Sequence, residues 1–412
     1  MKSEYISMRK VNLDMNLRKN AEQEYEKRIQ SPSAIVFDLQ ICGRPLFVML
    51  TPPLLASIVA IHKQSAVLSE LQFSLPGIAI SWYVKKLLVD EIGLTNEMEN
   101  VHSTRKEVKE AVESVQSLKT PVRNVRFWGM ADKYNSLLSG KTAELKTCRD
   151  IRKLYDAFVQ QEVIAEDEKD RPDGEIFRKG TVMVQDSHGN KIHEGVYPES
   201  DIIDTMEHAL ALLNDASIDR IIRIAMFHYL FGYIHPFYNG NGRLSRYISS
   251  MLLSAELGTL AGLRLSYVIK NHKKQYDHLF RDANDPHSMG DITDFVLTFC
   301  TYIKEALTDM AETLQAGEET IKGIGRVIGN RPEFKGYERI IDILALNGVF
   351  AEDALSMDEL RTHADCGRKL VQDALDVAKK LGILSQSRQG HKYLYTIRPE
   401  AWPYLIKKDN GA

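Results

Sequence analysis

Apolar residues recur at helical spacing along most of the chain. From Pro53 to about Gly93 the apolar positions follow the helical period, with breaks near Pro76-Gly77. The same period returns in several later stretches, so the sequence predicts a mainly helical protein. Those later helices are expected at about 103–118, 128–161, 200–213, 217–234, 243–256, 268–283 and 290–316.

Two segments carry strand signals instead. Residues 33–52 contain two short apolar runs separated by Gly43, which predicts a small hairpin. Residues 180–196 contain two further runs that flank a turn at 187–190 with a glycine in it. A second hairpin is therefore expected just before the helices of the middle of the chain.

The last 80 residues follow another rhythm. A helix is expected from Tyr337 to Leu346, ending at Asn347-Gly348, and Ser356 begins a second helix with capping residues. A third helix, 368–381, precedes two short strands around a glycine-containing turn. Three helices followed by a hairpin are typical of a winged helix.

Composition narrows the class of protein. The chain has 412 residues and a formal net charge of −3, which favours two or three domains and argues against a general polyanion binder. The N-terminus is polar, and no run of about 18 apolar residues occurs, so no membrane is expected. Four scattered cysteines without a CxxC spacing favour free thiols and a cytoplasmic location.

The chemistry is concentrated in one stretch, His235-Pro236-Phe237-Tyr238-Asn239-Gly240-Asn241-Gly242-Arg243-Leu244-Ser245-Arg246. Histidine accepts a proton near neutral pH. Glycines let backbone N–H groups converge on an anion, and arginines bind phosphate oxygens as a planar fork. The expected helix break places the turn at a helix N-terminus, which favours anions. The stretch predicts a site where a nucleotide phosphate meets a nucleophile.

This stretch resembles the motif of the Fic family, His-Pro-Phe-x-(Asp/Glu)-Gly-Asn-Gly-Arg-x-x-Arg, with one departure. The likeness covers roughly residues 95–310. It implies a Fic-type helical core with a β-hairpin flap, followed by the winged helix. The domains expected are an N-terminal helical region at 1–93, a Fic core with an inhibitory helix at 94–320, and a winged-helix domain at 331–405.

The resemblance also implies roles for single residues. His235 would be the general base that deprotonates a Ser, Thr or Tyr hydroxyl of a target protein, with Phe237 holding the loop. The alternative is a hydrogen-bonded core histidine. The nucleotide ATP would be bound by the anion turn, by both arginines and by an aromatic residue of the adenine pocket. These nucleotide-binding residues are Gly240, Asn241, Gly242, Arg243, Arg246 and Tyr276. Ordinary turn, ion-pair and core roles are the alternatives for them.

Asn239 is the departure from the motif. The family usually has Asp or Glu there, which holds Mg²⁺ against the phosphates. Magnesium favours carboxylate oxygens, although an amide carbonyl also coordinates it without adding charge. Asn239 is therefore the expected metal ligand, for Mg²⁺ or Mn²⁺, with weaker or altered metal binding.

A second likeness lies upstream, in Thr95-Asn96-Glu97-Met98-Glu99-Asn100, which resembles the Fic inhibitory motif (Ser/Thr)-x-x-x-Glu-(Gly/Asn). In the family this glutamate pairs with the second motif arginine. Glu99 would therefore occupy the guanidinium of Arg246 that otherwise binds the γ-phosphate, because a carboxylate fits the same fork. A solvated acidic helix is the alternative.

The leading hypothesis is a protein adenylyltransferase that transfers AMP from ATP to a target hydroxyl and is inhibited by Glu99. The target would dock on the flap hairpin 180–196 by strand addition. The alternatives are a nucleotide-sensing, DNA-linked regulator with little catalysis, or a Fic enzyme that transfers or removes another group. Residues 331–412 hold 13 Lys and Arg against 12 Asp and Glu. This balance favours protein contact over DNA for the winged helix, and a homodimer is left open.

Overall fold

The computed structural model describes residues 5–116, 125–141, 143–185, 189, 191–397 and 400. The chain divides into two compact units that cut across the predicted domains. The first unit comprises Met1–Ala66 and Leu88–Thr308, and the second comprises Val67–Leu87 and Asp309–Ala412. Most of the expected N-terminal region, 1–93, therefore belongs with the Fic-like core. Three long helices have residues in both units: α3 (Pro52–Ser74), α4 (Gly77–Met98) and α14 (Thr293–Asn330).

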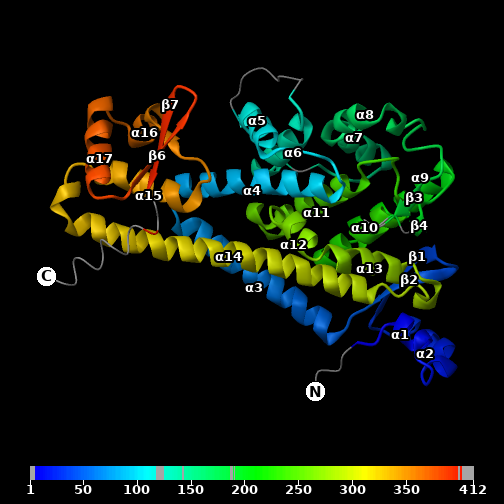
Figure 1. Cartoon of the computed structure of the whole chain (residues 1–412). Helices are drawn as coiled ribbons and strands as arrows, with labels where there is room; N and C mark the ends of the chain where they lie inside the picture. The colour runs from blue at the N-terminus through cyan, green and yellow to red at the C-terminus, as the bar shows by residue number, and fades with distance from the viewer. Residues whose placement is uncertain are drawn as a thin grey trace. The chain divides into compact units, whose positions relative to one another are not determined.

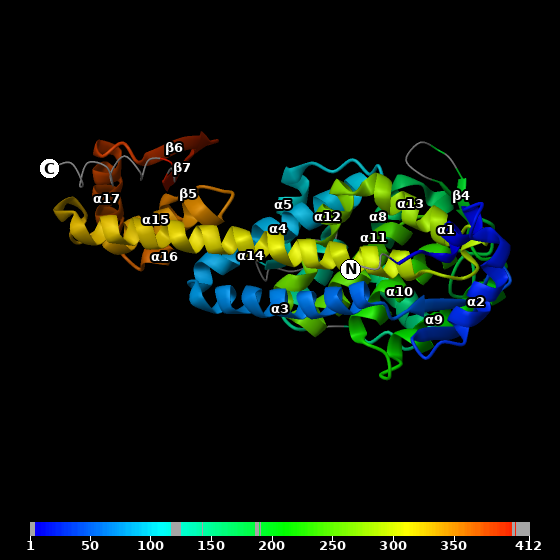
Figure 2. The ribbon, with the colours of Figure 1, turned by 90° about the horizontal axis from the view of Figure 1, so that it is seen from below.

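The first unit begins with a small helical segment that packs beside the expected hairpin (Figure 2). The hairpin is confirmed as β1 (Ala34–Ile41) and β2 (Arg44–Met49), with Ala34 paired to Met49. α1 (Met8–Leu13), η1 (Arg18–Asn20) and α2 (Ala21–Ile29) precede it. The carboxylate of Asp291 accepts from the Tyr5 hydroxyl at 2.6 Å and from the Met8 N–H at 2.9 Å. These bonds attach the N-terminal helices to the segment just before α14.

Helices form the rest of this unit (Figure 1). The helix α10 (Arg220–Ile234) is buried nearly all round, as expected for a central helix whose residues are apolar on every side. α9 and α11 both contact it. The remaining elements are α5 (Arg105–Gln116), α6 (Trp128–Leu138), α7 (Cys148–Phe158), α8 (Gln160–Glu166), η2 (Glu168–Asp170), β3 (Met183–Gln185), β4 (Lys191–Glu194), α9 (Glu199–Asn214), α10 (Arg220–Ile234), α11 (Asn241–Leu257), η3 (Thr259–Gly262), α12 (Leu265–Asn271), α13 (Lys273–Ala283) and η4 (Pro286–Ser288).

Several predicted helices have other bounds in the structure. The stretch 128–161 is broken into α6, α7 and the start of α8, because Thr147 and Asp150 form a capping box that begins α7 afresh. The stretch 268–283 is likewise divided at His272. α14 continues to Asn330 instead of ending near 316. Its Gly317 needs no helix break, because it lies where a Cβ would meet the Phe350 ring at 2.5 Å.

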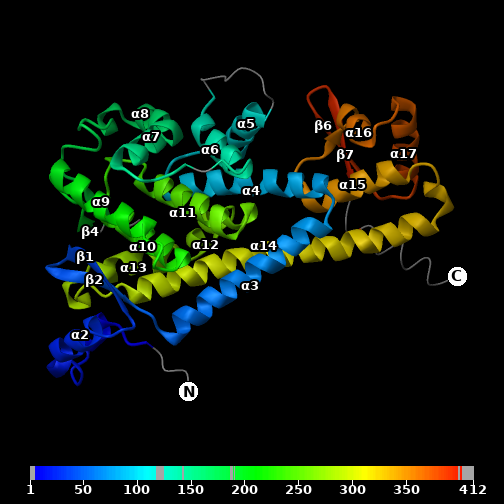
Figure 3. The same ribbon diagram turned by 180° about the vertical axis from the view of Figure 1, so that it is seen from behind.

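The second unit contains the elements predicted for the last 80 residues (Figure 3). They are η5 (Pro332–Phe334), α15 (Glu338–Phe350), β5 (Leu355–Ser356), α16 (Met357–Ala364), α17 (Arg368–Lys380), β6 (Leu384–Gln389) and β7 (Lys392–Ile397). The sheet is antiparallel in the order β5-β7-β6. Ser356 and Glu359 form the expected capping box of α16. Residues 398, 399 and 401–405 of the predicted domain lie outside the described residues.

One predicted helix end in this unit was wrong. α15 continues through Asn347-Gly348 to Phe350. A Cβ at Gly348 would meet the Ile397 carbonyl oxygen at 2.2 Å, so this glycine allows β7 to approach the helix. Its role is close packing and not helix termination.

Candidate active site

The motif His235–Arg246 forms the connection between α10 and α11. α10 ends at Ile234, and the next residue, His235, has a left-handed φ of 51° and donates its N–H to the Phe231 carbonyl at 3.0 Å. Gly240, with φ 81°, precedes α11. Glycine adopts this conformation without strain, so the chain reverses there and begins a new helix. The N–H groups of the first turn of α11 therefore border the loop.

Asn241 holds this loop in shape. Its side chain accepts from the Phe237 N–H at 3.0 Å and donates to the Phe237 carbonyl at 2.8 Å. The Phe237 ring is fully buried and stacks on Tyr155 with 3.7 Å between centroids. The polar clamp and the apolar anchor act on the same residue, so the backbone between His235 and Asn241 is fixed. The prediction that Phe237 packs inward is confirmed.

A cavity of about 290 Å³ opens over the loop. Its polar end holds His235, Asn241, Gly242 and Arg246, and its other walls come from α4, α13 and the flap. The remaining lining residues are Met98, Glu99, Asn100, Val182, Met183, Val184, His193, Gly232, Tyr238, Ser245, Lys273, Tyr276, Asp277 and Phe280. One end of the cavity is polar and contains His235, and the other end is partly apolar. This combination suits a nucleotide, which has charged phosphates and an apolar nucleobase.

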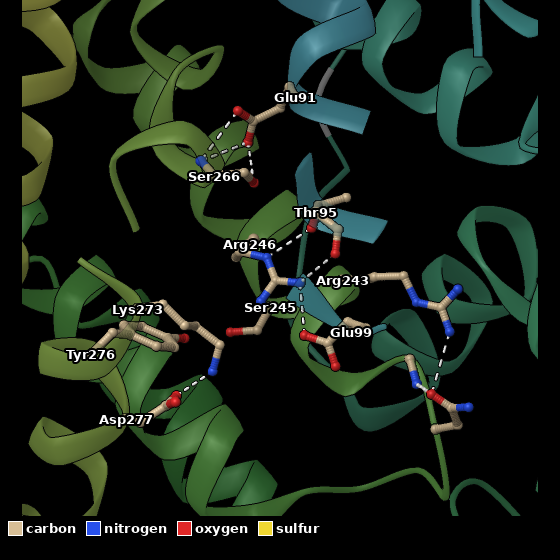
Figure 4. A network of polar contacts seen from close by, with 12 residues as sticks. Glu91, Thr95, Glu99, Arg243, Ser245, Arg246, Ser266, Lys273, Tyr276 and Asp277 are labelled. Atoms are coloured by element: carbon tan, nitrogen blue, oxygen red, sulfur yellow. Dashed lines mark hydrogen bonds and ion pairs between the residues drawn. The ribbon is translucent and has the colours of Figure 1, made fainter. Parts of the chain in front are cut away.

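Glu99 and Arg246 are paired inside this cavity (Figure 4). The Arg246 guanidinium donates to the Glu99 carboxylate at 2.8 Å. It also donates to the hydroxyl of Thr95 at 2.7 Å and to the Thr95 carbonyl at 3.1 Å. Thr95 and Glu99 lie one turn apart at the end of α4. Thr95 and Glu99 therefore hold one guanidinium, and Arg246 as a whole is only 1% exposed.

The Glu99 carboxylate also covers the anion turn. A Cβ added to Gly242 would meet Glu99 Oε1 at 2.2 Å. Burial would raise the pKa of Glu99, but the positive charges of Arg246, Arg243 and Lys273 outweigh it and lower the pKa below its usual range. Glu99 is therefore an anion at neutral pH. It lies between the N-terminus of α11 and Arg246, two groups that favour an anion.

Arg243 has a different partner. Its guanidinium forms two bonds with the Glu166 carboxylate, at 3.0 and 3.2 Å, and a third with the Asn239 amide oxygen at 3.3 Å. The amide oxygen of Asn239 also accepts from the Gly240 N–H, and its nitrogen donates to Asp170 at 3.0 Å. Arg243 is fully buried and does not line the cavity. Glu166 and Asp170, on α8 and η2, thus support the loop from behind.

His235 is half-buried at the floor of the cavity. Burial lowers the pKa of its imidazole to about 4, and the nearby His193 and Arg178 act in the same direction while Glu99 opposes them. The ring is therefore neutral at pH 7 and free to accept a proton. An anionic ligand in the cavity would raise this pKa, which strengthens the base when the site is filled.

Tyr276 lines the cavity and is fixed from behind by a histidine. Its hydroxyl is 2.8 Å from Nε2 of His228, whose Nδ1 is 2.9 Å from the Ser249 hydroxyl. Burial, assisted by the charge of Arg246, lowers the pKa of His228 to about 3, so this histidine is a neutral hydrogen-bonding residue. The rigid ring is consistent with the predicted adenine-pocket role and equally with a core aromatic.

The flap hairpin is present as β3 and β4. Met183 pairs with Glu194 and Val184 with His193, and three of these four side chains line the cavity. Residues 187, 188 and 190 of the predicted turn lie outside the described residues. The hairpin therefore forms one wall of the cavity that holds His235.

The structure gathers most of the predicted site residues and leaves three aside. His235, Asn241, Gly242, Arg246, Tyr276 and Glu99 line one cavity. Three predicted residues do not line it: Asn239, Gly240 and Arg243. The Arg243 guanidinium is bonded to Glu166 and to the Asn239 amide oxygen, away from the cavity. The ion pair Lys273–Asp277, which lines the cavity at the start of α13, was not predicted. A Lys and Asp spaced i, i+4 are the only sequence signal for it.

The donor set does not fit a metal held by the chain. The Asn239 amide oxygen is taken by Gly240 and Arg243 and does not face the cavity. Among the described residues, no three His, Cys, Asp or Glu side chains are grouped so that they could hold an ion. A carboxylate at position 239 would be the hard oxygen ligand that Mg²⁺ prefers. Position 239 itself therefore supplies no carboxylate to a cation.

Comparison with known proteins agrees with this geometry. The family model of the Fic/DOC family matches residues 147–253. A protein adenylyltransferase Fic from Drosophila mojavensis is 32% identical over 124 residues, and one from Drosophila virilis is 31% identical over the same length. Both alignments cover 30% of this chain and 22% and 23% of the fly proteins. The match thus spans less than a quarter of the relatives' length.

Two solved structures also resemble the chain. A Fic family protein from Desulfovibrio desulfuricans has a TM-score of 0.49 at 18% identity, covering 84% of this chain and 96% of that one. A Fic domain containing signaling protein from Bacteroides thetaiotaomicron has a TM-score of 0.40 at 16% identity, covering 62% and 97%.

With the motif, the helical core and the family match together, the chain is a Fic domain protein. The family model places this domain at residues 147–253, from the start of α7 into α11.

Within the described residues, no helix combines the length and the apolar character needed to span a bilayer.

Proposed function

We propose that this protein is an adenylyltransferase that moves AMP from ATP to a Ser, Thr or Tyr hydroxyl of a target protein. One observation carries the proposal. Glu99, a carboxylate, occupies the turn over Gly242 and the guanidinium of Arg246, beside the neutral His235. An anion site next to a base is what nucleotidyl transfer needs. The relatives named protein adenylyltransferase support the reaction type.

The reaction would proceed by in-line displacement at the α-phosphorus. His235 takes the proton of the target hydroxyl, the hydroxyl oxygen forms the bond to phosphorus, and the bond to pyrophosphate breaks. The first-turn N–H groups of α11, with Gly242 and Arg246, would stabilise the charge on the phosphates. The apolar end of the cavity, with Tyr276 and Phe280, would hold the adenine ring of ATP. The flap would hold the target as an added strand.

In this proposal Glu99 is an intramolecular inhibitor. Its carboxylate and the γ-phosphate compete for Arg246, so the productive arrangement of ATP requires Glu99 to leave. The Thr95 contacts keep Arg246 in place while Glu99 covers it. In this proposal the divalent metal is bound to ATP before the nucleotide enters the site, because Asn239 does not offer a carboxylate. Mg²⁺ or Mn²⁺ would then arrive with the nucleotide.

A nucleotide sensor with little catalysis is the second candidate, and the hydrogen-bonded state of Asn239 favours it. One assay separates the two: purified protein, α-labelled ATP and Mg²⁺ or Mn²⁺, comparing the wild type with Glu99→Gly and His235→Ala. Label incorporation that needs His235 supports the transferase. Nucleotide binding without incorporation in every variant supports the sensor and rejects the transferase. A Fic enzyme that transfers a group other than AMP would incorporate no label from ATP, and it would label the target only when the labelled donor carries that group.

For the C-terminal domain, read as a winged helix, we propose contact with a protein, including a second copy of this chain. α17 begins with the exposed Arg368 and Lys369, yet Asp373 and Asp376 follow on the same helix. DNA readers present a more consistently basic face. Failure of the full chain to shift labelled duplex DNA at low salt would support this assignment, and a salt-sensitive shift would reject it. A cytoplasmic location is proposed from the four free cysteines.

A further inference from the structure

Arg178 is a buried arginine that neither the motif nor the cavity accounts for. It lies in the loop between η2 and β3 and is fully buried. It does not line the cavity, and it forms no salt bridge within the described part of the chain. A buried charge without a counter-charge is costly unless hydrogen bonds satisfy it. Its contacts therefore indicate what the position requires.

The guanidinium of Arg178 is bonded entirely to backbone carbonyls. Nε donates to the His235 carbonyl at 2.9 Å, and Nη2 donates to the carbonyls of Val196 at 2.8 Å and Ile234 at 3.5 Å. Nη1 donates to the Gly180 carbonyl. Two of these acceptors are at the C-terminus of α10, where carbonyls lack helical partners and a cation is favourable. The other two are at the two bases of the flap hairpin.

Neighbouring contacts show that this junction is tight. The Arg178 N–H donates to the Pro236 carbonyl at 3.3 Å, and the Val196 N–H donates to the Ile234 carbonyl at 3.1 Å. A Cβ at Gly195 would meet Arg178 Nη2 at 2.6 Å and His235 Cβ at 3.1 Å. The end of the flap thus passes directly against the histidine and the arginine. His235 keeps its left-handed φ inside this set of bonds, a conformation that costs energy for an L residue.

We propose that Arg178 is a positioning residue that holds His235 and both ends of the flap hairpin in one fixed arrangement. The proposal rests on the transferase function, in which the flap holds the target and His235 takes its proton. A target strand paired to the flap would then place its hydroxyl in a constant position relative to the imidazole. The positive charge of Arg178 has a second effect, since it helps to keep His235 neutral.

The groups that set the protonation of His235 are few. Burial acts first, His193 on β4 and Arg178 lower its pKa, and it is raised by Glu99, just after α4, and by a backbone hydrogen bond at Gly232. Replacing Arg178 by a neutral side chain therefore raises the pKa of His235. Because burial also lowers this pKa, the variant that keeps the charge, Arg178→Lys, separates the effect of the charge from a change in burial.

The test uses the full chain in the Glu99→Gly background, with Arg178→Gln and Arg178→Lys. In Arg178→Gln we expect the labelling rate at saturating ATP to fall roughly 10- to 100-fold, because small displacements of catalytic groups have effects of that size. The KM for ATP should stay within about twofold, since Arg178 does not line the cavity. Arg178→Lys keeps the charge without the planar fork, so it should lose rate while His235 titrates nearly as before.

The titration of His235 is followed by NMR of ¹³C-labelled histidine, which needs no activity. Arg223→Gln is the matched control, since Arg223 is also buried and donates to a backbone carbonyl, that of Leu213 at 2.8 Å. An unchanged rate in Arg178→Gln, or a rate loss equalled by Arg223→Gln with no upward titration shift, overturns the proposal. If Arg178→Gln does not fold, Arg178→Lys is the deciding variant. A lower labelling rate with an unchanged KM for ATP supports the proposal, and an unchanged rate overturns it. If no Glu99→Gly chain incorporates label, the transferase fails, and the titration still decides whether Arg178 controls His235.

Discussion

Arg243 and Arg246 lie one turn apart on α11 and each is bonded to a glutamate, yet the two glutamates approach from different sides and use different numbers of oxygens. Glu99 reaches Arg246 from within the cavity, through a single oxygen, and its side chain is 28% exposed. Glu166 reaches Arg243 from behind the loop, through both oxygens, and its side chain is 25% exposed, so the two pairs differ in position and not in exposure. A ligand entering the cavity meets the first pair and not the second.

The difference separates a removable contact from a supporting one. Glu99 and a phosphate would use the same guanidinium, so the Glu99 contact opposes ligand binding. Glu166 holds Arg243, and Arg243 holds Asn239 beside the Gly240 turn, so the Glu166 contact maintains the loop that would receive the ligand. Removing one carboxylate should therefore activate the site, and removing the other should damage it.

The largest effect is expected from Glu99→Gly. Losing a charge-assisted bond of about 1.5–3 kcal/mol should raise label incorporation from ATP roughly 10- to 100-fold. The control is Glu97→Gly, on the same helix, because Glu97 pairs with Lys270 outside the cavity. Equal rates in the wild type and Glu99→Gly, with ATP binding intact, would remove the inhibitory role from Glu99.

Glu166→Gln should act in the opposite direction. Arg243 would keep its burial and lose its bidentate partner, so in the Glu99→Gly background both ATP affinity and labelling rate should fall about tenfold. Isothermal titration calorimetry with ATP and the labelling assay measure the two quantities. Glu168→Gln, on the neighbouring exposed turn, is the control. A gain of activity in Glu166→Gln would mean that Glu166 inhibits the site as Glu99 does, and the two glutamates would then not differ in role.

Thr95→Val should weaken the hold of the Thr95–Glu99 segment on Arg246 by less than Glu99→Gly does. The change keeps the shape of Thr95 but removes the acceptor for Arg246 Nε at 2.7 Å, a loss of about 1 kcal/mol. Arg246 should then leave Glu99 more readily, and labelling should rise a few-fold. A fall in labelling would show instead that Thr95 orients Arg246 for the phosphate.

The last prediction concerns stability, with no change expected in activity, and a third carboxylate, Glu91, which lies on α4 two turns before Glu99. Its oxygens accept from the Ser266 N–H and hydroxyl, with the shortest bond at 2.6 Å. Burial raises its pKa to about 7 despite these bonds. Because the folded pKa lies above the unfolded one, the contribution of Glu91 is complete below about pH 4.5 and declines as pH rises through 7.

The Glu91→Gln variant, which cannot ionise, should therefore gain stability relative to the wild type between pH 5 and 8.5. The difference at the upper end should be on the order of 3 kcal/mol or less. Thermal unfolding across this pH range measures it. Parallel curves for the two proteins would mean that Glu91 does not titrate in this window.

The sequence predicted the parts of this comparison unequally. The resemblance of the motif and of Thr95–Asn100 to Fic family patterns implied the Arg246 contact, because both partners lie in those patterns. Glu166 and Arg178 belong to no pattern, and their partners are 77 and 57 residues away, so only the folded chain reveals them. Helix ends failed for a related reason: Gly317 and Gly348 look like helix breakers but serve close contacts with Phe350 and β7.

The Asn241 clamp bears on the thermodynamics of recognition. Its two bonds to Phe237 and the stacked ring below close the loop into a rigid ring before any ligand arrives. A phosphate meeting that loop orders no backbone, so association should carry little conformational-entropy penalty from this segment. The entropy lost on binding should arise elsewhere, in the side chains of α4 and the flap that must rearrange around the nucleotide.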